Sequence, residues 1–264
     1  MEQALTDAPD GQISLTDPDA REMATRAQHS GHVGYNVQSV VDAETHLIVT
    51  HEVTNLGDDR DLLTKMATQT KAVPKRKDLH ILADKGYFSA LEILACHKAG
   101  ITETVPRSAS SGARSKGHFV KADFAFGHDT DIYRGPAGQA LTHRATTEQQ
   151  GQQMRCYWKR ACSGCHLKSR CTTGHERRVS WWEHEHLVGA SNARHRSPAA
   201  PMKVRRSTVE HPFGTIKAWT GPCHFLTRRF RGVRTEMALN VLAYYIKRMI
   251  ALVGIKALMA AIPE

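Results

Sequence analysis

The chain has 264 residues, of which 41% are hydrophobic, and its 36 Lys and Arg outnumber its 26 Asp and Glu to give a formal net charge of +10. This length suits one large domain or two modest ones. No apolar run reaches the roughly eighteen residues of a membrane span, and no signal-peptide pattern opens the chain, so a cytoplasmic protein without membrane contact is expected.

The first part of the chain predicts strands that alternate with helices. Residues 1–12 are expected to form a loose leader, and the next elements are a strand over 12–16, a hairpin over 35–53, a helix over 60–72, a strand over 79–83, a helix over 88–99 and a strand over 101–105. Asp58 or Asp59 is the expected N-cap of the first helix. This order predicts an α/β domain with a mixed sheet, of which residues 13–106 form the first part.

The second part of the chain begins with a stretch of different composition. Residues 107–200 are rich in Ser, Gly, His, Arg and Thr with little periodicity, and we interpret them as an insertion. Regular helices are expected over about 202–219 and 233–252, so that residues 201–264 complete the domain. The apolar face of the last helix is predicted to consist of Met237, Leu239, Val241, Leu242, Tyr245 and Ile246.

Acidic residues at strand ends are the first candidates for chemistry. Asp84 directly follows the predicted strand 79–83, and open α/β sheets bind ligands at the carboxyl ends of their strands. Asp17 closes the predicted strand 12–16 and is the preferred second acid. Asp19 and Asp42 remain alternatives, although Asp42 falls in the hairpin turn, where Asp is common for local reasons.

Glu210 is the third candidate acid, in the predicted helix 202–219. Arg206 precedes it by four residues and Lys217 follows it by seven, which places the three on one helix face. Neighbouring cations keep a carboxylate ionised and can hold phosphate. Pro212 interrupts this segment and is expected to kink the helix or to place its start near His211.

Basic residues concentrate around this carboxylate. Between residues 203 and 234 there are eight Lys or Arg and a single acid, Glu210. Such a stretch fits a polyanion held near a reactive centre, and a merely solvated basic face would have the same composition. The charge therefore has two interpretations, a surface that binds nucleic acid and a solvated basic face.

Four cysteines form a cluster, Cys156-x5-Cys162-x2-Cys165-x5-Cys171. Four thiolates at such spacing could hold a structural zinc ion in a tetrahedral site. Free thiols in a small packed knot are the alternative interpretation. Cytosolic chains seldom use disulfides, which favours either interpretation over a disulfide framework.

Taken in order, Asp17, Asp84-Lys85-Gly86-Tyr87 and Arg206-x3-Glu210-x6-Lys217 resemble the motifs of the DDE transposases of bacterial insertion sequences. The segments 34–38 and 209–214 are similar to a subgroup with a cysteine-containing insertion. The resemblance implies a ribonuclease-H-like core with that insertion before the last catalytic helix. The sequence departs from the family pattern in two ways. Lys203 stands where a tyrosine is usual, and no N-terminal helical region is expected before residue 13.

The resemblance also implies a function. Asp17, Asp84 and Glu210 would hold two Mg²⁺ or Mn²⁺ ions for cleavage and strand transfer of DNA at insertion-sequence ends. The expected DNA contacts are Tyr87, Lys203, Arg205, Arg206 and Lys217, and the expected assembly is a homodimer on transposon ends and target DNA. Three alternatives stay open: a truncated, inactive DNA-binding remnant, a nuclease on the same fold, and a zinc-stabilised basic protein without a nuclease site.

Overall fold

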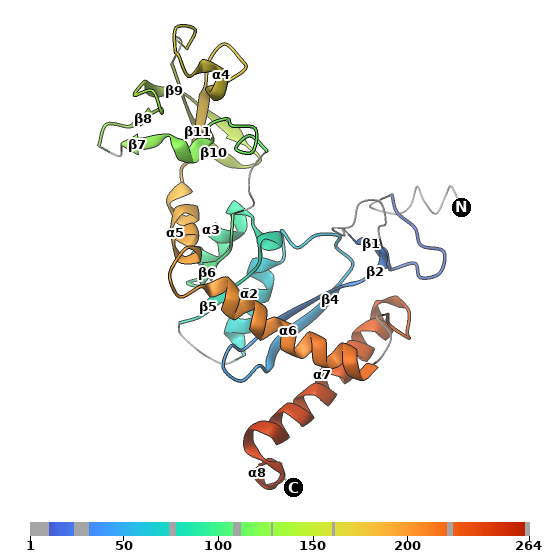
Figure 1. Ribbon diagram of the computed structural model, residues 1–264. Helices are drawn as coiled ribbons and strands as arrows, with labels where there is room; N and C mark the ends of the chain where they lie inside the picture. The colour runs from blue at the N-terminus through green and yellow to red at the C-terminus, as the bar shows by residue number, and fades with distance from the viewer. Residues whose placement is uncertain are drawn as a thin grey trace. The chain divides into compact units, whose positions relative to one another are not determined.

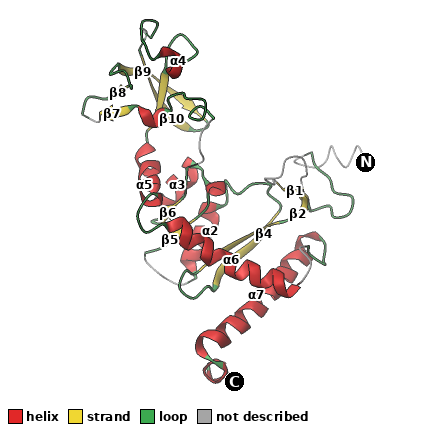
Figure 2. Cartoon of the chain, viewed as in Figure 1, coloured by secondary structure: helices red, strands yellow, loops and turns green. Residues whose placement is uncertain are grey.

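The computed structural model describes residues 11–23, 32–73, 78–107, 112–127, 129–159, 162–220 and 224–261. The chain divides into two compact units, one formed by Met1–Pro106 with Ser191–Glu264 and the other by Arg107–Ala190. The first unit combines helices with short strands, and the second is built mainly from strands (Figures 1 and 2). Within the described ranges, no helix has the length and apolarity that a bilayer crossing requires.

The strands of the first unit form three pairs. They are β1 (Arg21–Met23) with β2 (His32–Gly34), β3 (Asn36–Val41) with β4 (Ile48–Thr54), and β5 (His80–Leu82) with β6 (Thr102–Thr104). The first two pairs are antiparallel and the third is parallel. The predicted hairpin over 35–53 is confirmed by β3 and β4, and the predicted strands over 79–83 and 101–105 are confirmed by β5 and β6. The predicted strand over 12–16 is wrong, because these residues are irregular and pair with no strand among the described residues. Asp17 then turns the chain, since its carbonyl accepts a hydrogen bond from the amide of Ala20 and its side chain accepts one from the amide of Asp19.

The helices of the first unit follow the predicted pattern with shifted ends. They are α2 (Leu63–Ala72), the short 3-10 helix η1 (Lys85–Tyr87), α3 (Ala90–Lys98), α6 (Pro201–Thr220), α7 (Arg229–Val253) and α8 (Ile255–Ala260), while α5 (Glu185–His195) begins in the other unit. The predicted cap by Asp58 or Asp59 is wrong, because Leu62 is the N-cap of α2. Helix α6 does not start near His211: it runs through Pro212, whose fully buried side chain packs into the interior.

Two apolar clusters hold the first unit together. One joins the β3–β4 hairpin to α6 and α7 through residues such as Ile48, Val53 and Val233. The other joins α2 and α3 to β5 and β6 through Leu63, Cys96 and others. Burial removes these side chains from water, which stabilises the fold by about 25 cal/mol per Å² of apolar surface.

The buried face of α7 differs from the predicted one. Its buried residues are Val233, Met237, Val241 and Tyr244, whereas Leu239, Leu242 and Ile246 are exposed. The helix is hydrophobic on two sides, and the sequence alone does not distinguish which side meets the hairpin. The prediction was right for Met237 and Val241, and Tyr245 is partly buried against the same cluster.

The second unit contains a five-stranded antiparallel sheet in the order β11-β10-β9-β8-β7. Its strands are β7 (Ala125–Gly127), β8 (Ile132–Arg134), β9 (Ala140–Gln149), β10 (Gln152–Trp158) and β11 (Arg178–Trp182), with η2 (Lys121–Asp123) and α4 (Lys168–Cys171) beside them. Its core is a cluster of Phe124, Tyr133, Leu141, Tyr157 and Val179. The low periodicity of 107–200 therefore conceals a regular sheet. The predicted boundaries of the insertion stay a prediction.

Candidate active site

Asp84 lies two residues past β5, where the chain enters η1. Its side chain caps η1, with Oδ1 accepting a hydrogen bond of 2.8 Å from the amide of Gly86. Because β5 and β6 are parallel, this position is at the carboxyl edge of the pair. A carboxylate there faces the edge at which α/β sheets bind ligands.

Asp59 is the acidic neighbour of Asp84. A Cβ atom built on Gly86 would lie 2.9 Å from Asp84 Oδ1 and 3.3 Å from Asp59 Oδ2, so both carboxylates surround this glycine. Asp59 Oδ1 accepts hydrogen bonds from Asn36 Nδ2 at 2.8 Å and from Gln38 Nε2 at 2.7 Å. The strand β3 thus fixes Asp59, and the first turn of η1 fixes Asp84.

Helix α6 adds a cation to this pair of acids. Arg205 Nη2 lies 3.3 Å from Asp84 Oδ2 in a half-buried ion pair. Tyr87 donates a hydrogen bond to Gln38 Oε1. Burial raises the pKa of Tyr87, and the charges of Asp59 and Asp84 raise it further, so the hydroxyl remains a proton donor at neutral pH.

Asp17 lies at a different place, the N-terminus of α7. Its Oδ1 and Oδ2 accept from the amide of Arg229 at 3.2 and 3.1 Å, and Oδ2 also accepts from Tyr35 Oη at 2.8 Å. Asp19 Oδ2 accepts from the Phe230 amide at 3.0 Å. Free amides and the helix dipole favour negative charge at such an end, so both acids stabilise α7.

The pKa of Asp17 reflects this capping role. Burial acts to raise the pKa, but hydrogen bonds from Tyr35 and from the Arg229 amide outweigh it, and the net pKa lies below the ordinary value. The side chain is 9% exposed. The protein itself therefore holds Asp17 ionised, with both oxygens engaged. Asp42 also has a local role, because Oδ2 accepts from Thr45 within the hairpin turn.

Glu210 is exposed on α6, as are Arg206 and Lys217. These exposures agree with the shared helix face that their spacing predicts. Arg205 points to Asp84 from a different side of the same helix. The neighbouring His211 has a structural role, because its Nδ1 lies 3.0 Å from Tyr244 Oη, which in turn donates to the carbonyl of His46.

The carboxylates of the described residues do not fit a two-metal site. Within those ranges, no three His, Cys, Asp or Glu side chains are arranged to hold a metal ion. Asp17, Asp84 and Glu210 all belong to the described part, so the structure does not gather them. It gathers Asp59 with Asp84 instead. Asp59 was not among the predicted site residues. Asn36 and Gln38, two polar residues on one face of β3, were nevertheless a signal for a buried polar partner.

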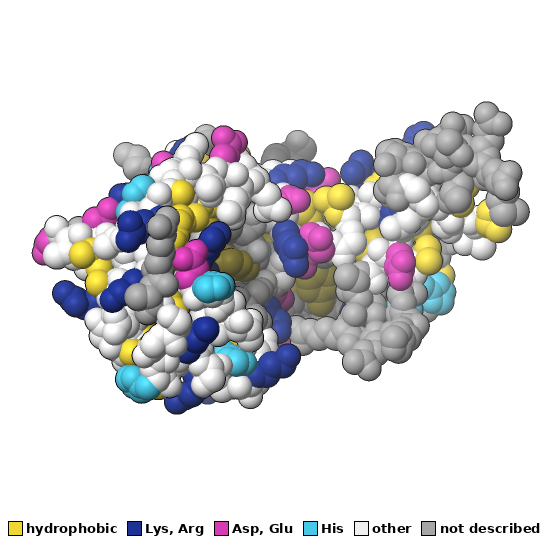
Figure 3. Space-filling model, turned by 90° about the horizontal axis from the view of Figure 1, so that it is seen from above, with side chains coloured by type: hydrophobic (Ala, Val, Ile, Leu, Met, Phe, Trp, Pro, Cys, Tyr) yellow, Lys and Arg dark blue, Asp and Glu magenta, His cyan; other side chains and the backbone are white. Residues whose placement is uncertain are grey.

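The predicted DNA-contacting residues fall into two groups. Lys203, Arg206 and Lys217 are exposed on α6, whereas Tyr87 and Arg205 belong to the acidic cluster. On the face shown in Figure 3, Lys and Arg side chains are dispersed among acidic and neutral ones.

The four clustered cysteines do not share one site. Cys162, Cys165 and Cys171 line a cavity of about 40 Å³. Burial raises the pKa of Cys171 and, although Arg177 lowers it, Cys162 and Cys165 raise it further. Cys156 contacts Thr147 and Ser180 on the sheet face opposite to Tyr157, whose side chain is in the core. The structure therefore does not support a zinc site of all four cysteines, since successive side chains of a strand point to opposite faces.

Comparison with known proteins identifies the family of this chain. The family model described as the transposase DDE domain matches residues 7–246, which include Asp59, Asp84 and helix α6. No curated protein and no solved structure matches significantly. The mixed α/β fold is consistent with the ribonuclease-H-like core of such domains, which act on DNA by phosphoryl transfer and use divalent metal ions such as Mg²⁺. The chain belongs to the transposase DDE domain family.

Proposed function

We propose that this chain cleaves DNA strands and transfers them at the ends of an insertion sequence, with Asp84 as the central carboxylate. The observation that carries the proposal is the cluster of Asp84, Asp59 and Arg205 at the carboxyl end of β5. Two adjacent carboxylates suit a divalent cation with hard oxygen ligands, Mg²⁺ or Mn²⁺. Asp59 and Asp84 would hold this cation, which would stabilise the charge that develops during phosphoryl transfer.

DNA binding is proposed for the exposed face of α6. Lys203, Arg206 and Lys217 are exposed cations on this helix, and Glu210 lies among them. Lys and Arg bind phosphates electrostatically, and an Arg can grip one through two parallel hydrogen bonds. Arg205 neutralises Asp84 and is near enough to hold a phosphate beside it. Glu210 stays in the proposal as a catalytic acid, whereas Asp17 is proposed to stabilise α7.

A homodimer is proposed from the second apolar side of α7. The exposed residues of this side recur at intervals of three and four: Leu239, Leu242, Ile246 and Val253, with half-buried Met249 between the last two. This spacing places all five on one stripe, opposite to the face that packs on the hairpin. Such a seven-residue repeat is the pattern by which two helices pack against each other.

The proposal is tested by nicking of supercoiled DNA in Mg²⁺ or Mn²⁺ by the chain and by its Asp84→Asn variant. The variant should lose nicking and keep its DNA affinity, since the cations of α6 are unchanged. Equal nicking by both chains would reject Asp84 as the catalytic acid. Nicking without joining of strands would indicate a nuclease on this fold, and DNA binding without nicking would indicate a DNA-binding remnant.

A further inference from the structure

An open groove lies in the first unit between α6 and α7, which pack against each other (Figure 1). Its volume is about 990 Å³, and the segment 224–228 and the start of β3 complete its walls. Val37, Ile216, Phe225 and Met237 line the groove and also belong to the apolar cluster between the hairpin and these helices. The floor of the groove is therefore the outer surface of a packed core.

Two large apolar side chains of the groove lie in water. Leu226 is 78% exposed and Leu239 is 61% exposed. The backbone at Leu226 is held in place, because Glu236 accepts hydrogen bonds from the amides of Leu226 and Thr227. The same segment lies close to α7, where a Cβ added to Gly232 would be 3.1 Å from Thr227 Cβ. Exposed apolar side chains around a hollow indicate a surface that another molecule covers.

The rim of the groove is positively charged. Among the lining residues that the structure describes, Lys217, Arg228, Arg229 and Arg231 are cations, and all four are exposed. Glu236 is the single carboxylate of that lining, and both of its oxygens already accept hydrogen bonds from the segment 226–227. The groove therefore combines an apolar floor with a surplus of positive charge.

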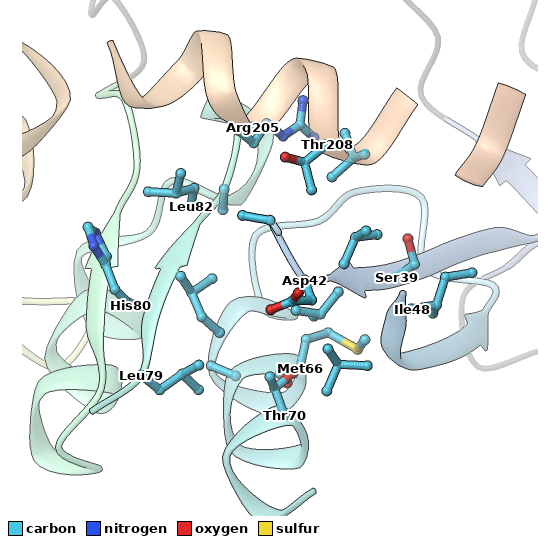
Figure 4. Close-up of a pocket in the computed structure, with 18 of the residues that line it drawn as sticks. Ser39, Asp42, Ile48, Met66, Thr70, Leu79, His80, Leu82, Arg205 and Thr208 are labelled. Atoms are coloured by element: carbon cyan, nitrogen blue, oxygen red, sulfur yellow. The ribbon is translucent and has the colours of Figure 1, made fainter. Parts of the chain in front are cut away.

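A second cavity of the first unit, of about 770 Å³, has a different charge. Figure 4 shows Met66, Leu79 and Leu82 among the residues that line it. Its described acidic residues are Asp42, Glu44 and Asp78. Arg205 is the only Lys or Arg of its described lining, and this cation is paired with Asp84. The positive rim thus distinguishes the groove of α6 and α7 from this cavity.

We propose that the groove binds an amphipathic helix of another protein, with apolar residues on one face and Asp or Glu on both flanks. Apolar side chains at positions i, i+3, i+4 and i+7 would enter the groove, and the flanking carboxylates would pair with Arg228, Arg229 and Arg231. A nucleic acid would engage these cations through phosphates but would leave Leu226 and Leu239 in water. An uncharged apolar helix would leave the cations without a partner.

The test uses the 264-residue protein without DNA or metal ions. The probe is a fluorescent fourteen-residue peptide of Leu and Glu with all Leu on one helix face. One reference peptide has the same composition with Leu dispersed around the helix, and the other has Lys in place of Glu. Fluorescence anisotropy should give the patterned acidic peptide a Kd at least about tenfold lower than that of either reference. Equal affinity for the dispersed peptide would show attraction of charge alone and would overturn the proposal.

Two pairs of variants locate the binding. Arg231→Glu reverses a charge of the rim and should weaken binding of the patterned peptide by at least about tenfold, whereas Lys256→Glu on α8 should not. Thr235→Trp should fill the groove and cause a similar loss, whereas Ala238→Trp changes a residue of α7 outside the described lining. All four positions are exposed, so the substitutions should preserve the fold. Unchanged affinity in Arg231→Glu or Thr235→Trp would contradict binding in the groove.

Two further measurements separate the groove from the other proposed surfaces. Leu242→Ala, in the apolar stripe proposed for the homodimer, should leave peptide affinity unchanged, and a loss there would place the peptide on the stripe instead. A labelled DNA duplex tests the nucleic acid alternative: weaker duplex binding by Arg231→Glu, together with no specific binding of the patterned peptide, would assign the rim to DNA. Neither measurement needs DNA cleavage, so this inference and the proposed function stand or fall separately.

Discussion

Asp59 and Asp84 approach each other around Gly86, where an added Cβ would be 2.9 Å from one carboxylate and 3.3 Å from the other. A side chain at residue 86 would therefore displace at least one of these carboxylates. Two like charges around one residue repel each other, and hydrogen bonds from Asn36 and Gln38 to Asp59, together with the ion pair of Arg205 with Asp84, offset the repulsion.

Replacing Asp59 by Asn should reduce metal-dependent DNA nicking as strongly as replacing Asp84. We expect a loss of at least about 10²-fold for each, because Asn lacks the negative charge of Asp, and removal of one electrostatic partner at a reacting centre costs about that much. The measurement is the initial rate of plasmid nicking at saturating Mn²⁺. Asp58→Asn is the control, since Asp58 is exposed next to Asp59. A full rate for Asp59→Asn would remove Asp59 from the site.

Replacing Asp17 by Ala should destabilise the fold by about 1 kcal/mol, the usual cost of a lost helix cap. The pKa of Asp17 is lowered from 3.8 in the folded chain, so ionised Asp17 stabilises it. This contribution is complete above the unfolded pKa and disappears as the pH falls through the lower folded pKa. Urea unfolding at pH 7 and below pH 3.8 measures it: the difference from the unmodified chain should shrink at the lower pH. A constant difference would contradict the capping role.

Arg205 and Arg206 are neighbours with different predicted roles. Arg206→Ala should weaken DNA binding uniformly and reduce the slope of log affinity against log salt by about one. Arg205→Ala should change that slope less, because Arg205 is paired with Asp84. Fluorescence anisotropy with a labelled duplex at several salt concentrations distinguishes them. Identical slopes for the two variants would contradict the division of α6 into two faces.

Replacing Leu242 by Lys should dissociate the proposed homodimer. A charge on the apolar stripe of α7 loses water on association without gaining a partner. Ala243→Lys adds the same charge beside the stripe, at another exposed position. Sedimentation should give a monomer for Leu242→Lys and an unchanged mass for Ala243→Lys. If the unmodified chain sediments as a monomer, the proposed homodimer through this stripe is contradicted.

Local patterns predicted most elements of the first unit. The β-branched hairpin, the position of Asp84 after an apolar strand and the helices α2, α3, α6 and α7 all follow from sequence periodicity. Periodicity did not predict which side of α7 is buried, because the helix has apolar residues on two sides. Contact with the hairpin is what buries Val233 and Tyr244. The sheet of the second unit was missed because its long strand β9 is mostly polar and exposed.

Long-range contacts account for what was missed in the site. Asp59 was interpreted as a helix cap, and its actual partners Asn36 and Gln38 precede it by more than twenty residues. Asp17 was interpreted as catalytic because of its place in the chain order, and its partner Arg229 is 212 residues away. The polar pair on β3 indicates a buried polar partner but does not identify it, and the approach of Asp17 to Arg229 has no signal in local spacing, because both contacts depend on tertiary structure.

The contact between Asp17 and Arg229 has a consequence for how the protein is made. Asp17 leaves the ribosome long before Arg229 is synthesised, because 212 residues separate them. The turn at 17–19 therefore stays without its docking partner until those residues have been made, and the first turn of α7 is fixed only after that. Proteolytic removal of the segment that contains Asp17 and Asp19 should therefore loosen the start of α7.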